Sequence, residues 1–474
     1  MIPPRPGAPI VLALGLLCSL AACSKGPEQR SVILITIDTL RADHLSGAGY
    51  GRRTSPHLDR LAQEGTSFDW ALSPTSYTRP SHASMLTGLD PSFHSVGLLN
   101  YELALRPEER TLPEICGAAG LSTAAVVSNF ILQKGSGLEQ GFATYDDRLP
   151  DLEQVRRLPE RSAKHAVDSA LALLPSLEQG RFFLWLHLQD PHGPYTPAAH
   201  IAEPEPVGAA PERLERALPL GTDQSGYRSI PAYQGVGTER AFEQYRARYD
   251  REIKATDQEL GRFLDALRAK GLLDTTLVIV TADHGEALGE DDYFFSHCHS
   301  VGLDQVHVPL IVAGPGVREG ARIAAPVGNL DVFATALEFL DLPAPAGTHS
   351  RSLLPVLRGA APVPEGPVFT ASISQRGIAL GGQYLRTDRF PATDTEFWRV
   401  NPLNQSTFVP LGTNAWSLAG RQAVPIEPLP ELLTRLQQFG AEADAALKAL
   451  TSGLDTRAID EGARRSLRAL GYAK

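Results

Sequence analysis

Cysteine is scarce in this sequence, with four residues among 474. Two of them, Cys18 and Cys23, lie near the N-terminus, and the spacing of Cys116 and Cys298 does not require that they pair. A fold held together by many disulfides is therefore excluded, and so is a metal site made of cysteine ligands. Whether Cys116 and Cys298 form a single bridge stays open.

Runs of one charge and long apolar runs are absent as well. The net charge is −10, and no block of like charges is present, so we expect no nucleic-acid partner. An apolar helix needs about 20 residues to span a bilayer, and the apolar stretch 10–17 is shorter. Because the chain is acidic, an anionic substrate must be attracted by a bound cation or by a local pocket.

The short apolar stretch is typical of an export signal. Arg5 precedes it, and the small residues Ala21 and Ala22 stand directly before Cys23. This arrangement matches the cleavage site of bacterial lipoproteins. We therefore expect a signal peptide at 1–22 and lipidation of Cys23, and the alternative is an ordinary secretory signal with an incidental cysteine.

The residues after the cleavage site indicate where such a lipoprotein resides. Several acyl chains together give stable anchoring in a membrane, and residues 23–30 suit a short tether. By resemblance to Gram-negative lipoproteins, Ser24 in place of an aspartate favours the outer membrane. We expect a lipid-anchored protein of the bacterial cell envelope, in the outer membrane or on the periplasmic face.

Beyond the tether, apolar runs rich in β-branched residues indicate strands that are buried on both faces. These runs are 31–37, 123–127, 182–188, 277–281 and 309–312. Helical patterns separate them, the clearest extending from Phe242 to Leu267 with apolar residues spaced by three and four. Strands that alternate with helices predict an α/β fold with a parallel sheet covered by helices.

The remaining segments divide the chain. Residues 197–237 are rich in proline and glycine and predict a long irregular insertion, a lid or a substrate-facing loop. A proline-rich stretch near 360–367 follows the last strand of the sheet. We therefore expect a large domain at 31–361 and a smaller α+β subdomain at 362–474, with short strands near 368–372 and 384–386 and a helix at 432–450.

Polar residues follow four of the predicted strands. These residues are Asp38, Asn129, Asp190 with His192, and Asp283 with His284. Because ligands bind beyond the carboxyl ends of strands in open parallel sheets, we expect an active site at this edge. Asp38, Asp283 and His284 are suitable ligands for Zn²⁺, Mn²⁺, Ca²⁺ or Mg²⁺, although a lone Asp-His-Gly turn is equally explained by an aspartate that caps a helix.

A hydroxyl near these ligands completes the candidate site. Pro80 suits the first turn of a helix, so Thr78 lies at a helix N-terminus, where free N–H groups favour an anion. A threonine hydroxyl bound to a metal ion loses its proton more readily and can attack phosphorus or sulfur. The plain alternative is that Thr78 caps the helix.

Several ordered blocks resemble the sulfatase family of the alkaline phosphatase superfamily. They are 38–45, 54–59, 80–88, 190–195, 281–286, His297 with 308–310, and 467–472. The resemblance extends from about residue 31 to the end of the chain. It implies an alkaline-phosphatase-like, mixed but mostly parallel sheet between helices, with 31–361 as the catalytic domain and a metal-dependent ester hydrolase activity.

The sequence departs from sulfatases proper at the nucleophile. Those enzymes carry a cysteine or serine that is oxidised to formylglycine, and Thr78 stands at that position. Their arginine four residues later is His82, and Thr39 replaces the second aspartate of their first metal block. Their Lys-Trp-His block is missing, and Asn129 stands in that region. The formylglycine route is therefore not supported.

Other branches of the superfamily use a metal-bound threonine, among them phosphodiesterases and phosphoethanolamine transferases. Their metal ligands correspond to Asp38, Thr78, Asp283 and His284. Their other active-site groups correspond to His192 and His297 near the phosphoryl group and to Asn129 on a non-bridging oxygen. This resemblance implies one or two divalent ions (Zn, Ca or Mn) and a small anionic ester as substrate.

We expect a hydrolase of sulfate, phosphate or phosphonate esters with Thr78 as nucleophile. A formylglycine hydrate expels sulfate by elimination and a threonine ester cannot, so the chemistry favours phosphoryl or phosphonyl transfer while overall similarity favours sulfatase. One alternative is a phosphoethanolamine-type transferase of the cell envelope, which usually carries several membrane helices before its catalytic domain. Another is a non-catalytic lipoprotein that retains the fold.

Several other side chains have plainer interpretations. His187 is expected to pack or to lie at the surface. His299 and His307 flank His297 in the sequence, and the pattern before residue 308 favours His297 over them. Glu286 is expected to support a ligand or cap a helix. Arg41 is expected to form an ion pair.

Overall fold

The computed structural model describes residues 1, 29–94, 96, 104–209, 212–390 and 409–451. The predicted signal peptide, the lipidation site at Cys23 and the closing motif at 467–472 lie outside the described residues. Within the described part, no helix is both long and apolar enough to cross a membrane.

An eight-stranded sheet forms the centre of the molecule, in the order β14-β2-β13-β9-β1-β8-β4-β5. In that order the strands are Ala321–Ile323, Thr66–Phe68, Leu310–Ala313, Thr276–Ala282, Ser31–Ile37, Phe182–Leu188, Ser122–Val126 and Thr144–Asp146. The strands β9, β1, β8, β4 and β5 are all parallel, and β13 is antiparallel to β9. The predicted mixed, mostly parallel sheet is thereby confirmed.

The middle strand β1 shows why these residues form a buried sheet. Every residue of β1 is buried, and its register pairs Ile35 with Leu186 on one side and with Val280 on the other. A strand with helices on both faces needs apolar side chains in both directions, which gives a continuous apolar run instead of alternation. Of the five runs expected in a parallel sheet, 309–312 is the exception, since it corresponds to β13 and is antiparallel to β9.

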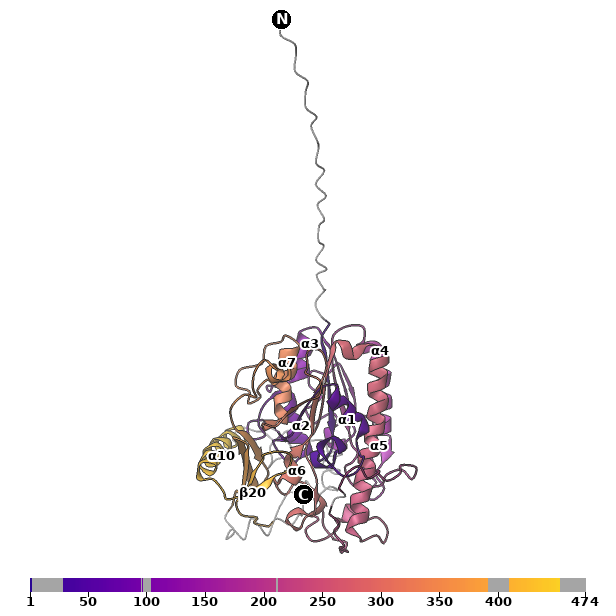
Figure 1. Cartoon of the computed structure of the whole chain (residues 1–474), viewed down its shortest axis with the longest axis vertical. Helices are drawn as coiled ribbons and strands as arrows, with labels where there is room; N and C mark the ends of the chain where they lie inside the picture. Colours follow the sequence, from indigo (N-terminus) through magenta and orange to yellow (C-terminus); the bar gives the residue numbers. More distant parts are fainter. Residues whose placement is uncertain (2–28, 95, 97–103, 210–211, 391–408, 452–474) are drawn as a thin grey trace.

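Helices cover both faces of this sheet (Figure 1). On one face lie α1 (Pro56–Gln63), α4 (Ala163–Leu177) and α5 (Phe242–Ala269). On the other lie α2 (Thr78–Thr87), α3 (Leu112–Ala118) and α7 (Val332–Phe339). The helix predicted at 242–267 is α5, and its buried residues include Tyr245, Tyr249 and Leu260.

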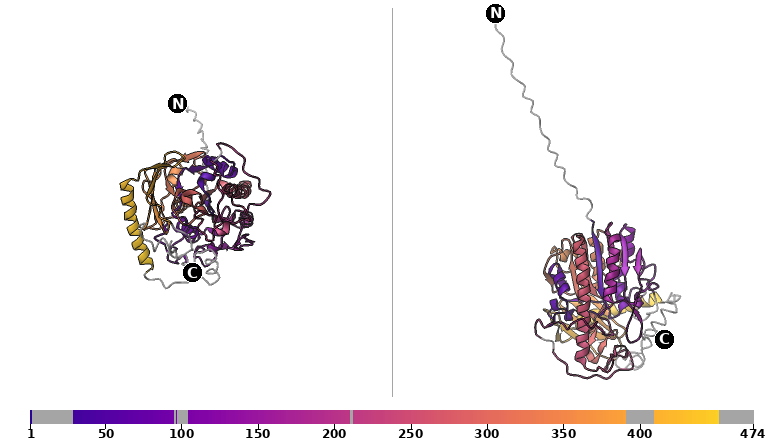
Figure 2. Two further views of the ribbon diagram at one scale, coloured as in Figure 1. Left: turned by 90° about the horizontal axis from the view of Figure 1, so that it is seen from below. Right: turned by 90° about the vertical axis from the view of Figure 1, so that its right-hand side faces the viewer.

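A second, five-stranded antiparallel sheet follows the central one. It consists of β16 (Val368–Ala371), β17 (Gln375–Leu380), β18 (Gln383–Asp388), β19 (Asn414–Ser417) and β20 (Val424–Ile426). Helix α10 (Pro430–Thr451) lies along its outer side, away from the central sheet (Figure 2). The expected C-terminal strands and helix are therefore present.

Short elements complete the described chain. The short strands are β3 (Ala71–Leu72), β6 (Asp151–Leu152), β7 (Pro159–Glu160), β10 (Ala287–Leu288), β11 (Phe294–Ser296), β12 (His307–Val308) and β15 (Val327–Gly328). The short helices are α6 (Leu303–Val306) and α8 (Leu354–Leu357). The 3-10 turns are η1 (Ala42–His44), η2 (Ser46–Ala48), η3 (Phe130–Leu132), η4 (Ala232–Gln234), η5 (Leu272–Asp274), η6 (Glu290–Asp292) and η7 (Asn329–Asp331).

Candidate active site

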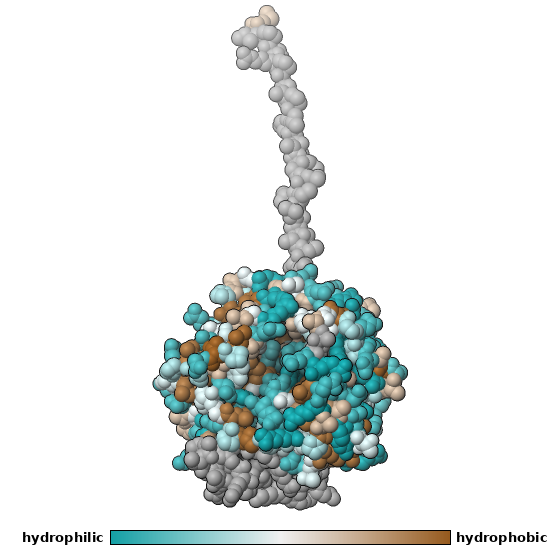
Figure 3. Space-filling model, turned by 60° about the horizontal axis from the view of Figure 1, so that its bottom comes forward, coloured by the Kyte–Doolittle hydropathy of each residue, from teal (hydrophilic) through white to brown (hydrophobic). Residues whose placement is uncertain are grey.

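Polar side chains gather at the carboxyl end of the central strands. Asp38 follows β1, Asn129 lies beyond β4, His192 lies beyond β8, and Asp283 with His284 follows β9. Because β1 is the neighbour of both β8 and β9 in the sheet, these segments meet at one edge. This end of the molecule comes forward in Figure 3, where hydrophilic side chains surround a hollow.

The predicted ligands Asp38, Asp283 and His284 form one cluster, with one ligand atom from each within 4.8 Å of the others. His284 Nε2 lies 3.8 Å from Asp38 Oδ1 and 3.5 Å from Asp283 Oδ2. All three side chains are fully buried. The structure thus brings together residues that are separated by some 245 positions in the chain.

Each carboxylate of the cluster has one anchored oxygen and one free oxygen. Asp283 Oδ1 accepts hydrogen bonds from the backbone N–H of Thr39 (3.2 Å) and of His284 (2.8 Å), and Asp38 Oδ2 accepts one from Asn129 Nδ2 (3.2 Å). Asp38 Oδ1 and Asp283 Oδ2 have no partner among the described residues. Buried carboxylate oxygens without partners are costly unless a cation meets them.

The imidazole of His284 is oriented as a metal ligand. Its Nδ1 donates a hydrogen bond to the carbonyl oxygen of Gly285 at 2.9 Å, so the lone pair is on Nε2, which faces the carboxylates. A backbone carbonyl that fixes the tautomer of a ligating histidine is a common feature of metal sites. The donor set of two carboxylates, an imidazole and the nearby hydroxyl of Thr78 therefore fits a divalent cation.

The pKa values of this cluster are shifted by burial and by the neighbouring charges. Burial and the neighbouring carboxylate of Asp38 raise the pKa of Asp283, and burial raises the pKa of Asp38 despite nearby histidines. Although burial acts to lower it, the carboxylates of Asp283 and Asp38 raise the pKa of His284. Two carboxylates buried side by side disfavour their own ionisation and favour a positive charge beside them, which a divalent ion would supply.

Helix α2 presents Thr78 to the cluster. The hydroxyl Oγ1 lies 3.1 Å from His284 Nε2, and because that nitrogen carries the lone pair, the hydroxyl is the donor. The N-cap position of α2 is Tyr77, and no side chain caps the helix. The side chain of Thr78 is therefore directed to the ligand cluster, and the plain alternative of a helix cap is wrong.

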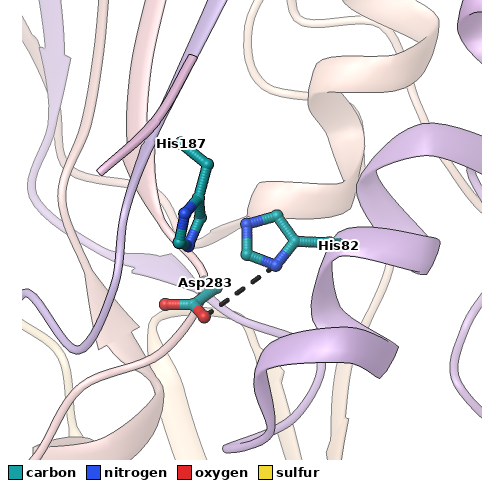
Figure 4. Close-up of side chains that lie close together, drawn as sticks. All are labelled: His82, His187 and Asp283. Atoms are coloured by element: carbon teal, nitrogen blue, oxygen red, sulfur yellow. Dashed lines mark ion pairs between the residues drawn. The ribbon is translucent and has the colours of Figure 1, made fainter. Parts of the chain in front are cut away.

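His82, which stands where sulfatases proper have arginine, is committed to a structural network. Its Nδ1 donates to the carbonyl oxygen of Thr78 at 2.8 Å, and its Nε2 accepts from Thr36 Oγ1 at 3.0 Å, while Trp185 Nε1 donates to the same hydroxyl. Burial lowers the pKa of His82 to about 3. Although His82, His187 and Asp283 lie close enough to suggest a second metal site (Figure 4), both ring nitrogens of His82 are occupied.

Sequence reasoning missed His187. Its Nδ1 accepts a hydrogen bond from the backbone N–H of Ser128 (3.2 Å), so in the neutral ring Nε2 carries the proton. That Nε2 is 3.7 Å from Asp38 Oδ2 and has no hydrogen-bond partner among the described residues. Burial lowers the pKa of His187 to about 4. The missed signal is its register opposite Thr36, two residues before Asp38.

His192 and His297 lie side by side near the ligand cluster, as expected. Their rings are 5.2 Å apart, and the ring of His297 is 4.5 Å from that of His284. His192 Nδ1 donates to the carbonyl oxygen of Gly193 at 2.8 Å, so its Nε2 has a lone pair. His297 Nδ1 lies 3.1 Å from Glu286 Oε1.

Burial keeps this histidine pair neutral. It lowers the pKa of His192 to about 3 and the pKa of His297 well below its ordinary value. It also raises the pKa of Glu286 to about 8. Neutral imidazoles are suited to accept or relay protons.

A pocket opens over these groups. Its lining includes the predicted residues Thr78, Asn129, His192 and His297. It also includes residues that the sequence did not single out. These are Glu153, Arg156, Glu160, Gln189, Gln224 and Tyr233. Gln224 and Tyr233 belong to the irregular insertion, so part of that segment faces the pocket.

Other candidates have structural roles. Asp190 accepts a hydrogen bond from the backbone N–H of Ala163 at the start of α4, at 2.7 Å. Arg41 pairs with Asp43 and with Glu290, as expected. His299 and His307 bond to Gln305 and to the backbone of Asp69, away from the pocket lining. Cys116 and Cys298 are both buried, and they do not form a disulfide bond with each other.

Comparison with known proteins identifies the architecture. A family model described as Sulfatase matches residues 30–342. The chain is 25% identical over 438 residues to an N-acetylglucosamine-6-O-sulfatase of Bacteroides thetaiotaomicron, which covers 75% of this chain and 76% of that protein. It is 30% identical over 404 residues to the multifunctional alkaline phosphatase superfamily protein PehA of Trinickia caryophylli, covering 70% of this chain and 78% of that one.

The fold agrees with a solved structure, the phosphonate monoester hydrolase of Silicibacter pomeroyi. The TM-score is 0.60 at 22% sequence identity, and the match covers 90% of this chain and 96% of that one. These findings confirm the resemblance predicted from the ordered motifs and the expectation of a sulfatase-like ester hydrolase.

Proposed function

Because the chain belongs to the sulfatase family, we propose that it hydrolyses small anionic esters of sulfate, phosphate or phosphonate by way of a threonine nucleophile. Asp38, Thr78, Asp283 and His284 would hold a divalent cation (Zn, Ca or Mn). The names of its relatives support this range of substrates, since one is a sulfatase, another is called multifunctional and a structural neighbour is a phosphonate monoester hydrolase.

One observation carries the proposal. Thr78 lines the pocket, and its hydroxyl lies 3.1 Å from His284 Nε2, near two buried carboxylate oxygens that lack partners among the described residues. A bound cation supplies positive charge that favours ionisation of this hydroxyl and offsets charge on the ester oxygens. A nucleophile at the edge of a pocket, with that charge beside it, is the arrangement that ester transfer requires.

In the first step, Thr78 Oγ1 attacks the sulfur or phosphorus in line with the leaving oxygen. The new bond joins Oγ1 to that atom, the ester bond breaks, and the alcohol departs with a proton. His192 Nε2, which has a lone pair, accepts the hydroxyl proton. His297 Nδ1 and Glu286 Oε1 lie 3.1 Å apart and share a proton. This pair can pass the proton through the imidazole to the leaving oxygen.

In the second step, water attacks the threonine ester and regenerates the hydroxyl. His297, which with Glu286 gave up its proton in the first step, takes the proton of that water, and His192 returns the proton it accepted to Thr78 Oγ1; both histidines lie at the pocket wall. Asn129 donates to Asp38 and lines the pocket, so its second amide hydrogen is available to a non-bridging oxygen. Because a threonine ester cannot break down by elimination, this step favours phosphoryl and phosphonyl groups over sulfate.

The cellular place of the protein is part of the proposal. The leader and Ala21-Ala22-Cys23 support export and lipidation of Cys23, with the mature protein held on the bacterial cell envelope by acyl chains. Metabolic labelling with a fatty acid analogue, with Cys23→Ala as control, tests this point. Equal labelling of both forms would disprove lipidation at Cys23.

The activity is tested by rates on matched aryl esters. An aryl sulfate, an aryl phosphate monoester, a phosphodiester and a phosphonate monoester are compared in the native protein and in Thr78→Ala. We expect measurable turnover of at least one ester, lost in the variant, and mass spectrometry of quenched enzyme showing the adduct on the peptide that contains Thr78. Rates equal to the variant on every ester would overturn the proposal.

A further inference from the structure

Arg156 has no part in the chemistry described above, yet it lines the same pocket. It belongs to the loop of the β6–β7 hairpin, which is inserted between β5 and α4. Of the described residues that line the pocket, Arg156 alone carries a fixed positive charge. Because the chain as a whole has a net charge of −10, a fixed cation in the pocket lining creates a local region that favours an anion.

The guanidinium of Arg156 is held in one orientation. Its Nε lies 3.3 Å from Glu153 Oε1, and the same carboxylate accepts a hydrogen bond from the backbone N–H of Arg156. Its Cζ lies 4.4 Å from the centre of the Tyr233 ring, a cation–π distance. The side chain is only 15% exposed. An arginine fixed on one edge and on one face loses little entropy when it binds an anion.

The outer edge of the guanidinium is available. Among the described residues, no acceptor engages Nη1 or Nη2, and neither atom is enclosed. These two groups form a planar fork that matches the two oxygens of a carboxylate or the oxygens of a sulfate. The edge is therefore a donor pair without a protein partner, at the wall of a pocket.

A row of ring contacts separates Arg156 from the reacting atoms. His284 contacts His297 (4.5 Å between centres), His297 contacts His192 (5.2 Å) and His192 contacts Tyr233 (6.4 Å). Arg156 lies on Tyr233, at the other end of this row from the His284 that faces Thr78. The transferred group must be at Thr78, so Arg156 is placed to meet a different part of the substrate.

The pocket between these ends has unsatisfied polar groups. The amide oxygens of Gln189 and Gln224 are buried and have no partner among the described residues, and both residues line the pocket. Glu160, also in the lining, has its pKa raised to about 8 by burial and by nearby carboxylates, so it is largely neutral near pH 7. The side of the pocket toward Arg156 therefore suits a polar leaving group.

We propose that Arg156 forms a subsite for a second anionic group, a carboxylate or a similar oxyanion, on the leaving alcohol. The substrate then has two anionic groups, with its ester group at Thr78 and its second group on the fork of Arg156. This inference rests on the proposed function and narrows its substrate class. The hairpin 151–160, not the catalytic cluster, selects the leaving group.

The test uses pairs of aryl esters that differ in charge but not in shape. The substrates are sulfate, phosphate or phosphonate esters formed at the phenol oxygen of 4-hydroxybenzoate and of 4-hydroxybenzamide. The corresponding 3-hydroxy pair is also compared, because it moves the second group to another position on the ring. For each pair, the ratio of kcat/KM for the carboxylate to that for the amide is measured in the native protein, in Arg156→Gln and in Arg156→Lys. Taking the ratio cancels the difference between the leaving groups.

We expect Arg156→Gln to lower this ratio by about tenfold to a hundredfold for at least one ring position, the range of a hydrogen bond to a charged group. The amide esters should retain their kcat/KM. Arg156→Lys, which keeps the charge and loses the fork, should fall between. The matched control is Arg157→Gln, an exposed arginine of the same hairpin that does not line the pocket.

Binding of the product gives a readout that needs no turnover. 4-Hydroxybenzoate should bind the native protein more tightly than 4-hydroxybenzamide in calorimetry, and Arg156→Gln should remove the difference. If Arg156→Gln lowers both esters equally, the arginine supports the loop or contacts the transferred group, and the subsite is disproved. Unchanged ratios at both ring positions also disprove it. Failure of the proposed function is distinct, because native protein and Thr78→Ala would then be equally inactive.

Discussion

The two sheets of this molecule differ in how completely their buried polar groups are hydrogen-bonded. At the carboxyl end of the central sheet, Asp38, Asp283, His187 and Glu286 each have a buried atom without a hydrogen-bond partner among the described residues. In the described part of the second sheet and α10, every buried side-chain nitrogen and oxygen has a partner. Unsatisfied polar groups cost stability. Their occurrence together at the carboxyl end of the central sheet therefore indicates a ligand-binding site.

Arg386 of β18 illustrates the satisfied region. Its guanidinium donates to Asp291 Oδ2 (2.6 Å), to Ser300 (3.0 Å) and to Asn414 (3.1 Å), so its charge is fully compensated. Arg156 at the pocket has Glu153 on one edge and a free outer edge. The same side chain type is structural in one place and available in the other, and only its partners show the difference.

Removing the nucleophile should have the largest effect on function. We expect Thr78→Ala to lower kcat by about 10⁴-fold or more, the scale seen when a covalent nucleophile is removed. Thr78→Ser, which retains a hydroxyl, should keep a measurable rate. The measurement is kcat and KM on the best aryl ester, with Thr87→Ala in the same helix as control. A fully active Thr78→Ala would show that the unsatisfied cluster serves something other than this chemistry.

Removing the proposed metal ion should destabilise the folded protein. Chelation should lower the unfolding free energy, and readdition of Zn²⁺, Ca²⁺ or Mn²⁺ at about 1,000 times its Kd should restore about 4 kcal/mol. The measurement is thermal unfolding together with metal content by mass spectrometry. In Asp283→Asn the chelator should have no effect on unfolding, because a ligand oxygen is lost. An equal response in Asp283→Asn would show that the ion binds elsewhere.

In the second sheet, a core substitution should change stability and leave catalysis alone. Leu436 of α10 is 1% exposed and packs with Ile378, Leu385 and Ala415. Leu436→Ala should cost about 2–5 kcal/mol of unfolding free energy, measured by denaturant titration, with kcat of the folded protein unchanged. The control is Gln437→Ala on the exposed side of the same helix. A loss of kcat without a loss of stability would erase the division between the two regions.

The smallest expected effect concerns pH and Glu160. Burial, with Asp190, Glu153 and Asp151 nearby and Arg156 opposing, raises the pKa of Glu160 from 4.5 to about 8. Between these two pH values the folded state binds the proton that the unfolded state has lost. This group therefore contributes a stability that falls as pH rises from about 4.5 to about 8.

The measurement is the melting temperature of Glu160→Gln and of the native protein across this pH range. Because glutamine cannot ionise, the variant should lose less stability than the native protein as pH rises, and the curves should diverge most near pH 8. The control is Glu259→Gln, a carboxylate at the outer side of α5. Parallel curves would show that Glu160 is ionised in the folded protein.

The strands and the candidate metal-ligand cluster were predictable because their signals are local. β1, β8 and β9 are continuous apolar runs, and the ligands follow them directly in the chain. Thr78 and His297 were placed by their motifs. The edge strands β5 and β14 and the inner strand β2 were not predicted, because each is only three residues long and too short to show a pattern.

The residues of the pocket wall could not be predicted from the sequence, for a different reason. Arg156 comes from a hairpin and Tyr233 from an irregular insertion, segments without periodicity whose positions depend on tertiary packing. His187 has the alternation of an ordinary strand residue, and only the pairing of β8 with β1 reveals its neighbour Asp38. The candidate catalytic groups at strand ends could thus be predicted from the sequence, whereas the residues proposed to recognise the leaving group could not.

In the proposed mechanism, the residue at the start of α2 determines when the protein becomes active. A threonine nucleophile would need no oxidation to an aldehyde, so the proposed enzyme would need no partner to mature it. Protein produced in a host without such a maturation system should therefore have the same specific activity as protein from the native host.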